Sequence, residues 1–121
     1  MLLLWLACLV PVAADYQLLN KPGQRVDVNS KLVAGKQTLV VFHSDNSPIS
    51  RRMLGEFKAL GERRQDLAVL IVNVNVLGSP VAKQYNITSV PSCKIYDAKG
   101  MLTMEGSPAY NQALKWCSAE N

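Results

Sequence analysis

The residues of this sequence that could take part in chemistry gather around one short segment, Ser47-Pro48-Ile49-Ser50, with the only histidine, His43, four residues before Ser47. A serine hydroxyl becomes a nucleophile only beside a base that takes up its proton. Alternation at the end of a strand does not place His43 beside Ser47, and no carboxylate is in position to orient the imidazole. The pattern therefore argues against serine hydrolysis, and the two hydroxyls need another explanation.

The cysteines form no redox or metal motif. Cys93 lies on a predicted strand and Cys117 in the predicted last helix, so neither is at a helix N-terminus, where a thiolate is stabilised. We favour two buried, unreactive thiols, and a structural disulfide between them stays open. We expect no metal site and no cofactor.

The composition is that of one compact domain. Of the 121 residues, 49% are apolar and 18% are charged, which excludes an intrinsically disordered chain. The formal net charge is +4, but the lysines and arginines are not interleaved with aromatic side chains. We therefore expect no binding to nucleic acid.

The first 14 residues, MLLLWLACLVPVAA, contain no charged side chain. This apolar run is shorter than the roughly 20 residues that a membrane-spanning helix needs, and it ends in the small residues that a signal peptidase requires. We expect a signal peptide over 1–14, cleaved after Ala14, and a mature protein that is periplasmic or secreted and leaves the membrane. Two alternatives are a lipoprotein acylated at Cys8 and a buried first element, against which Pro11 argues.

Beyond this leader, residues 15–36 form a mixed lead-in, in which 26–28 alternate and could pair at a sheet edge. Apolar, β-branched runs predict strands buried on both faces at 38–42 and 67–74, and Ser47 is a good N-cap for a helix that follows it. The remaining segments predict a short helix at 79–85, strands at 93–96 and 101–105, and a helix at 108–119. This order predicts an α/β domain with a central mixed sheet of four to five strands and helices on both faces.

The order of elements, the loop after Phe42 and the segment YNITSVPSCKIYDAKG at 85–100 resemble thioredoxins. The most specific feature is Val90-Pro91, just ahead of a strand and an Asp-x-x-Gly turn. The resemblance implies a cis peptide bond there, which an X-Pro bond permits. It extends over nearly the whole mature chain, and we assign 37–121 to a thioredoxin-like domain.

Thioredoxins carry a Cys-x-x-Cys motif that begins five residues after this phenylalanine, and here those two positions are Ser47 and Ser50. Thiol-disulfide exchange needs a thiolate that attacks a disulfide and a second thiol that resolves the mixed disulfide, and serine supplies neither. Ser47 keeps its value as an N-cap, about 1 kcal/mol. The buried acid that many family members have before the phenylalanine is also replaced, by Val41. The chain as written is therefore expected to be inactive in redox chemistry.

The resemblance also implies a binding surface that does not depend on sulfur. In the family, the backbone of the residue before this proline, here Val90, pairs with an extended segment of a partner protein. Ser47, Pro48, Ile49 and Pro91 would line the same groove. We expect an exported, redox-inactive module that binds protein partners in extended conformation. The alternative is a thiol-disulfide oxidoreductase whose Cys-Pro-Ile-Cys has been changed to serines in this chain, and a domain outside this family is a third interpretation.

Overall fold

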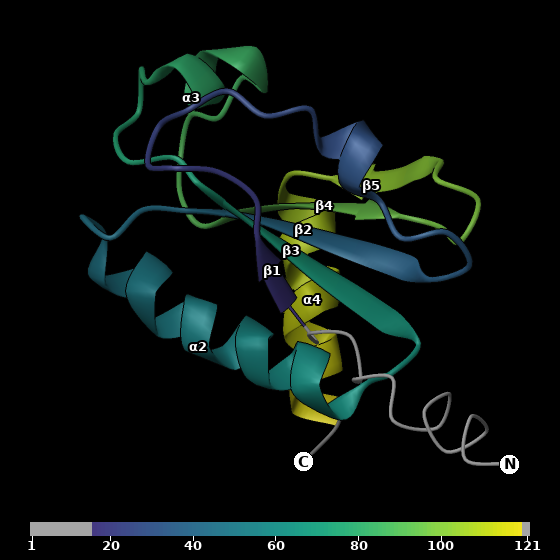
Figure 1. The fold of residues 1–121 in the computed structure, drawn as a ribbon. Helices are drawn as coiled ribbons and strands as arrows, with labels where there is room; N and C mark the ends of the chain where they lie inside the picture. The colour runs from purple at the N-terminus through teal and green to yellow at the C-terminus, as the bar shows by residue number, and fades with distance from the viewer. Residues whose placement is uncertain (1–15, 120–121) are drawn as a thin grey trace, which may run out of the picture.

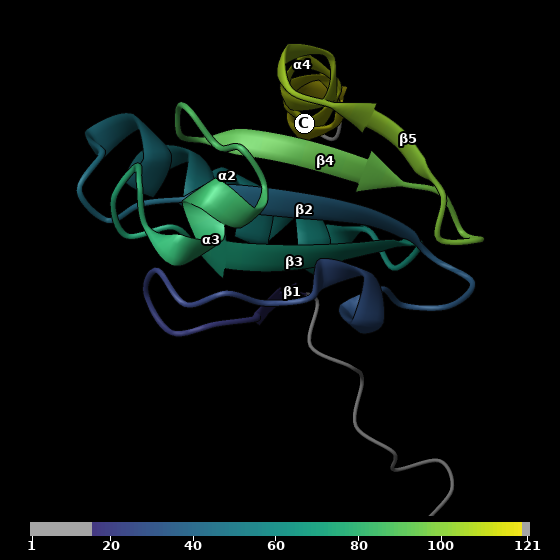
Figure 2. The ribbon, with the colours of Figure 1, turned by 90° about the horizontal axis from the view of Figure 1, so that it is seen from above.

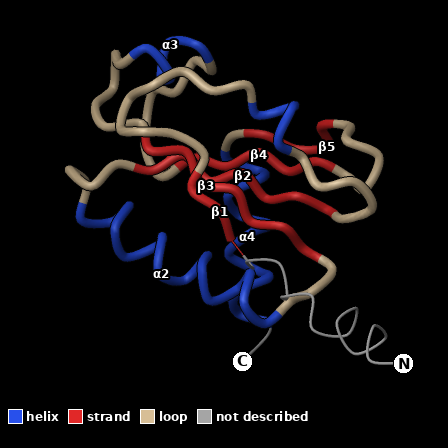
Figure 3. The backbone as a smooth tube through the Cα atoms, in the orientation of Figure 1, coloured by secondary structure: helices blue, strands red, loops and turns tan. Residues whose placement is uncertain are grey.

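The structure is a computed structural model, and it describes residues 16–119. Strands and helices alternate along most of this part of the chain (Figures 1 and 3). The elements are β1 (Tyr16–Leu18), the 3-10 helix η1 (Val28–Lys31), β2 (Gln37–His43), α2 (Pro48–Arg63), β3 (Leu67–Asn73), α3 (Pro80–Gln84), β4 (Ser92–Tyr96), β5 (Leu102–Glu105) and α4 (Ser107–Ala119). The predicted signal peptide and its cleavage site lie outside the described residues.

The five strands form one mixed sheet in the order β1-β3-β2-β4-β5 (Figure 2). β3 is parallel to both β1 and β2, whereas β4 is antiparallel to β2 and to β5. β2 and β3 occupy the centre, and nearly all of their side chains are buried. Their continuous apolar runs are therefore explained by burial on both faces of the sheet.

Neighbouring residues of β2 point to opposite faces and so enter two separate clusters of buried side chains. Val41 packs in the cluster that α2 and α4 cover, with Phe57 and Ala113 among its members. Phe42 packs in the other cluster, to which α3 contributes Val81 and η1 contributes its first residue. The predicted α/β architecture, with a mixed sheet and helices on both faces, is confirmed.

The lead-in is more ordered than its sequence indicates. β1 adds to the sheet as an edge strand, with Leu18 opposite Ile71 of β3. The prediction that 26–28 pair at a sheet edge is wrong, because Val28 begins η1 and buries its side chain under the sheet. Within residues 16–119, no helix is both long enough and apolar enough to cross a bilayer.

Candidate binding groove at the start of helix α2

Helix α2 begins where the two serines lie. Ser47 is the N-cap, with an extended backbone, and its Oγ accepts a hydrogen bond from the Ser50 N–H at 3.2 Å. Pro48 occupies the first helical position, where the missing N–H costs nothing. Both features follow from local sequence, so the start of α2 could be predicted before the fold was known.

The second serine is engaged more deeply than the first. Ser50 is fully buried, and its Oγ accepts a hydrogen bond from the backbone N–H of Ser44 at 2.9 Å. This contact joins the first turn of α2 to the loop that leaves β2. Both serine oxygens therefore accept backbone hydrogen bonds that hold the loop and the helix start together.

The second part of the groove is the loop before β4. The Val90–Pro91 peptide bond is cis. Ser92, the next residue, pairs with Phe42 in the sheet, which fixes the loop relative to β2. Val90 is half-buried, and among residues 16–119 neither its N–H nor its C=O has a hydrogen-bond partner.

Ser47 and Val90 meet at a slot, by which we mean the pocket of about 260 Å³ between the α2 loop and the loop after β3. Its other lining residues are Ser44, Asn46, Asn75, Val76 and Leu77. Ile49 and Pro48 are exposed but do not line the slot. The structure thus brings together two of the predicted groove residues directly.

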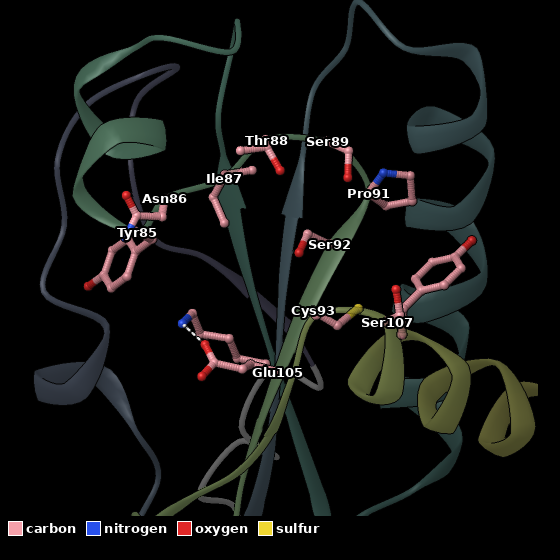
Figure 4. A pocket seen from close by; sticks show the side chains of 13 residues that line it. Tyr85, Asn86, Ile87, Thr88, Ser89, Pro91, Ser92, Cys93, Glu105 and Ser107 are labelled. Atoms are coloured by element: carbon pink, nitrogen blue, oxygen red, sulfur yellow. Dashed lines mark hydrogen bonds and ion pairs between the residues drawn. The ribbon is translucent and has the colours of Figure 1, made fainter.

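Pro91 lies on a different and larger pocket, of about 450 Å³. Figure 4 shows it with Ser92, Cys93 and Ser107 around that pocket, and the end of β5 forms another wall. The loop before β4 therefore separates the slot from the larger pocket, with Val90 on one and Pro91 on the other.

His43 is not placed to act as a base for Ser47. His43 is buried and lines a third pocket, beneath α2, which Ser47 does not line. Its Nδ1 has no hydrogen-bond partner within the described residues and lies 3.9 Å from Oδ1 of Asp45. Burial lowers the pKa of His43, an effect that Asp45 opposes and Lys58 reinforces. An imidazole held in this way gives no support to a serine nucleophile.

The two described cysteines are free and buried. Both belong to the cluster under α2 and α4, and burial raises the pKa of Cys93 to about 12. Burial also raises the pKa of Cys117. The expected burial of both thiols is confirmed, and the structure contains no disulfide between them. Across residues 16–119, no group of three or more His, Cys, Asp and Glu side chains could hold a metal ion.

Sequence reasoning missed most of the slot. Ser44, Asn46 and the segment 75–77 come from two loops that are about thirty residues apart in the chain. Asn75 has a left-handed backbone, with φ of 67°, a conformation that asparagine adopts more readily than most residues. An asparagine directly after the predicted strand at 67–74 was an available signal of this turn.

The fold has many counterparts among solved structures. The short form of thioredoxin f from spinach chloroplast superposes with a TM-score of 0.66 and 20% identity, over 90% of this chain and 96% of that one. The chain has a thioredoxin-like fold. Thioredoxin from Trichomonas vaginalis superposes on this thioredoxin-like domain with a TM-score of 0.60 and 13% identity, over 90% of this chain and all of that one.

A third counterpart was solved together with another protein. In a crystal structure of a complex between ferredoxin:thioredoxin reductase and thioredoxin f2, the matching chain gives a TM-score of 0.64 and 22% identity, over 91% of this chain and 98% of that one. No protein-family model and no curated protein matches the sequence. Identities at this level show the fold alone.

Proposed function

We propose that this protein is an exported thioredoxin-like module that cannot exchange disulfides and binds extended segments of partner proteins at the groove between Ser47 and Val90. Pro48 and Ile49, exposed at the start of α2, and Pro91, on the other side of the loop before β4, would extend the contact with the partner beyond the slot. This function requires an open backbone edge and an accessible apolar surface, and it requires no thiol.

The observation that carries the proposal is that the backbone N–H and C=O of Val90 have no hydrogen-bond partner within residues 16–119. A half-buried peptide group without a partner loses part of its hydration and gains no hydrogen bond in return. An extended segment that lies against Val90 can supply both the acceptor and the donor. Backbone pairing of this kind makes few demands on the sequence of the partner, so the groove suits unfolded or extended chains.

Both the motif and its surroundings support the absence of redox activity. Ser47 and Ser50 have hydroxyl oxygens at the two positions where thiol-disulfide exchange needs sulfur, and both oxygens accept backbone hydrogen bonds. The nearest remaining thiol, Cys93, is fully buried with a raised pKa, so it does not supply a thiolate to the groove. We expect no turnover in an insulin-reduction assay.

Two further observations support export and protein partners. Residues 1–14 have the apolar composition and the small-residue end of a signal peptide. The complex that contains thioredoxin f2 shows this fold engaged by another protein. N-terminal sequencing of the protein after its export would read Asp15 first. Recovery of the uncleaved chain with the cytoplasmic fraction would contradict the export part of the proposal.

The binding test uses reduced, carboxymethylated α-lactalbumin, a chain that stays unfolded, and native α-lactalbumin as the folded comparison. We expect the mature protein to bind the unfolded chain and not the native one, as measured by fluorescence anisotropy. Ile49→Asp places a charge at the groove and is expected to weaken binding about fivefold or more.

The chain offers a closely matched control. Met101, in the turn between β4 and β5, is an apolar side chain 64% exposed, the same fraction as Ile49. Met101→Asp makes the same change of charge at an equally exposed apolar side chain that lies outside the groove. Equal losses of affinity in the two variants, or no binding by the unchanged protein, would refute the proposed function.

A further inference from the structure

The pocket beneath α2 gathers polar side chains that take no part in the groove. It has a volume of about 210 Å³, and β1, β2, β3 and α2 all contribute to its walls. We call it the histidine pocket, because the buried side chain of His43 lines it together with Asp45, Lys58 and Asn73. It shares no lining residue with the slot, so its chemistry is separate from that of the groove.

Three side chains of the histidine pocket carry nitrogen donors that have no acceptor within residues 16–119. His43 is buried, and neither of its ring nitrogens makes a hydrogen bond there. Asn73 is also buried; its Oδ1 accepts the Asn75 N–H at 2.9 Å, which leaves its Nδ2 without a partner among those residues. The half-buried Lys58 has no ion pair in the same part of the chain, and its Nζ lies 5.1 Å from the centre of the Tyr16 ring. Donors that lose water without gaining an acceptor reduce stability, so an acceptor in the pocket would stabilise all three.

The other walls of the histidine pocket are apolar. Leu54 of α2, Ile71 of β3 and Leu18 of β1 line it, together with Tyr16. A few polar groups that converge in an otherwise apolar cavity are typical of small-molecule sites. The volume is smaller than that of pockets that hold drug-sized ligands, so the ligand must be compact.

The charges around the pocket favour an anionic ligand. Among the described lining residues, Asp45 is the one carboxylate, and its Oδ1 lies 3.9 Å from Nδ1 of His43. The side chain of Asp45 is 70% exposed, so water screens its charge, and Arg51 donates to its backbone carbonyl. Lys58 is less exposed and has no acidic partner within residues 16–119, so its positive charge acts more strongly inside the pocket. A carboxylate can accept from an ammonium and an amide at once, in charge-assisted hydrogen bonds.

We propose that the histidine pocket binds a small monocarboxylic acid with a compact apolar body, whose carboxylate accepts hydrogen bonds from Lys58 and Asn73 beside the imidazole of His43. The apolar body packs against Leu54 and Ile71. The site does not depend on the proposed function, because a chain that binds no extended segment at the groove would still have these donors and walls.

The binding test compares three small probes with the mature protein. Benzoate has both a carboxylate and an apolar ring, benzamide has the ring without the charge, and acetate has the charge without the ring. We expect benzoate to bind about tenfold or more tightly than either of the others, as measured by NMR titration of backbone amide signals. The signals that shift most should be those of Leu54, Lys58 and Asn73.

The imidazole gives a second measurement. His43 is the only histidine of the chain, so its ring signals are unambiguous in the untagged protein. Burial lowers the pKa of His43, Asp45 opposes this effect, and Lys58 adds to it. A carboxylate bound beside the ring favours the protonated form, so saturating benzoate should raise the pKa of His43, and benzamide should leave it unchanged.

Two variants change the charge of the pocket in opposite directions. Lys58→Met removes the ammonium and keeps an apolar stem, so benzoate binding should weaken about fivefold or more while benzamide binding changes little. Asp45→Asn removes the opposing carboxylate at an exposed position, so benzoate should bind about twofold or more tightly. Lys115→Met and Asp27→Asn make the same changes at exposed positions outside the pocket and should have little effect.

The results decide the proposal in either direction. Selective benzoate binding that Lys58→Met weakens and Asp45→Asn strengthens would support it. No binding of benzoate, equal binding of benzoate and benzamide, or equal effects of Lys58→Met and Lys115→Met would overturn it. A pKa of His43 that benzoate does not raise would also overturn it, because the carboxylate would then lie away from the imidazole.

Discussion

The buried hydroxyl of Ser50 gives the most direct test of how the groove is built. Ser50→Ala removes the one acceptor that the Ser44 N–H has within residues 16–119, and both residues are buried. An N–H that is left without a partner inside a protein costs about 1–3 kcal/mol. Alanine regains about 0.5 kcal/mol through its higher helix propensity. We therefore expect the free energy of unfolding to fall by about 0.5–2.5 kcal/mol.

The assay is urea unfolding followed by far-UV circular dichroism. For a chain of this size the slope is about 1–2 kcal/mol per molar urea, so the midpoint should fall by about 1 M with the slope unchanged. Ser118→Ala, on an exposed position of α4, is the matched control, and its effect should stay within about 0.5 kcal/mol.

An Ser50→Ala variant as stable as the unchanged protein would refute the reasoning. In that case the Ser44 N–H does not depend on the hydroxyl, and Ser50 is only a small residue that fits the site. Ser50→Cys gives an independent reading of the same contact. Because sulfur is a weaker acceptor than oxygen, this variant should lie between Ser50→Ala and the unchanged protein.

Three further predictions concern the thiols and the histidine. The double variant Ser47→Cys, Ser50→Cys should form a 47–50 disulfide on oxidation and gain some insulin-reducing activity, though less than a typical thioredoxin; peptide mapping that finds no such disulfide would mean that the motif is misaligned. In the unchanged protein, Cys93 and Cys117 should resist iodoacetamide at pH 8 and react once urea unfolds the chain, because burial raises the pKa of both thiols; rapid labelling of Cys93 in the folded state, seen by mass spectrometry, would contradict its burial. Because burial lowers the pKa of His43 in the folded state, the unfolded chain takes up the proton first, so stability is complete above about pH 6.5 and declines as the pH falls below that value. Urea midpoints at pH 7.5 and 5.5 should show this decline, and a decline of the same size in His43→Gln would assign it to other groups.

Local sequence was enough to predict the elements that depend on neighbouring residues. The apolar runs of β2 and β3, the cap at Ser47 and the helix that follows it are determined within a few residues of chain. Val90-Pro91 before a strand, together with the position of Phe42, was enough to indicate the kind of fold. The absence of sulfur from the motif is a property of the sequence itself.

Pairing between distant segments could not be predicted in the same way. β1 is only three residues long and joins the sheet because β3 offers it a free edge. The slot exists because the loop after β3 turns at Asn75 and meets the side chains of Ser44 and Asn46. Neither loop contains a sequence pattern that identifies the other loop as its partner. The backbone carbonyl of any residue can accept a hydrogen bond, so residue type does not predict which carbonyl is used.

Periodicity and residue type are local properties, so the α/β core and the motif in which oxygen replaces sulfur could be predicted from the sequence. The hydrogen bonds of the serine oxygens, the burial of His43 away from them and the Val90 backbone without a partner within residues 16–119 could be seen only in the folded chain. Those features depend on which segments meet in space. Burial and hydrogen bonding are set by the packed neighbours of a residue rather than by its neighbours in the chain.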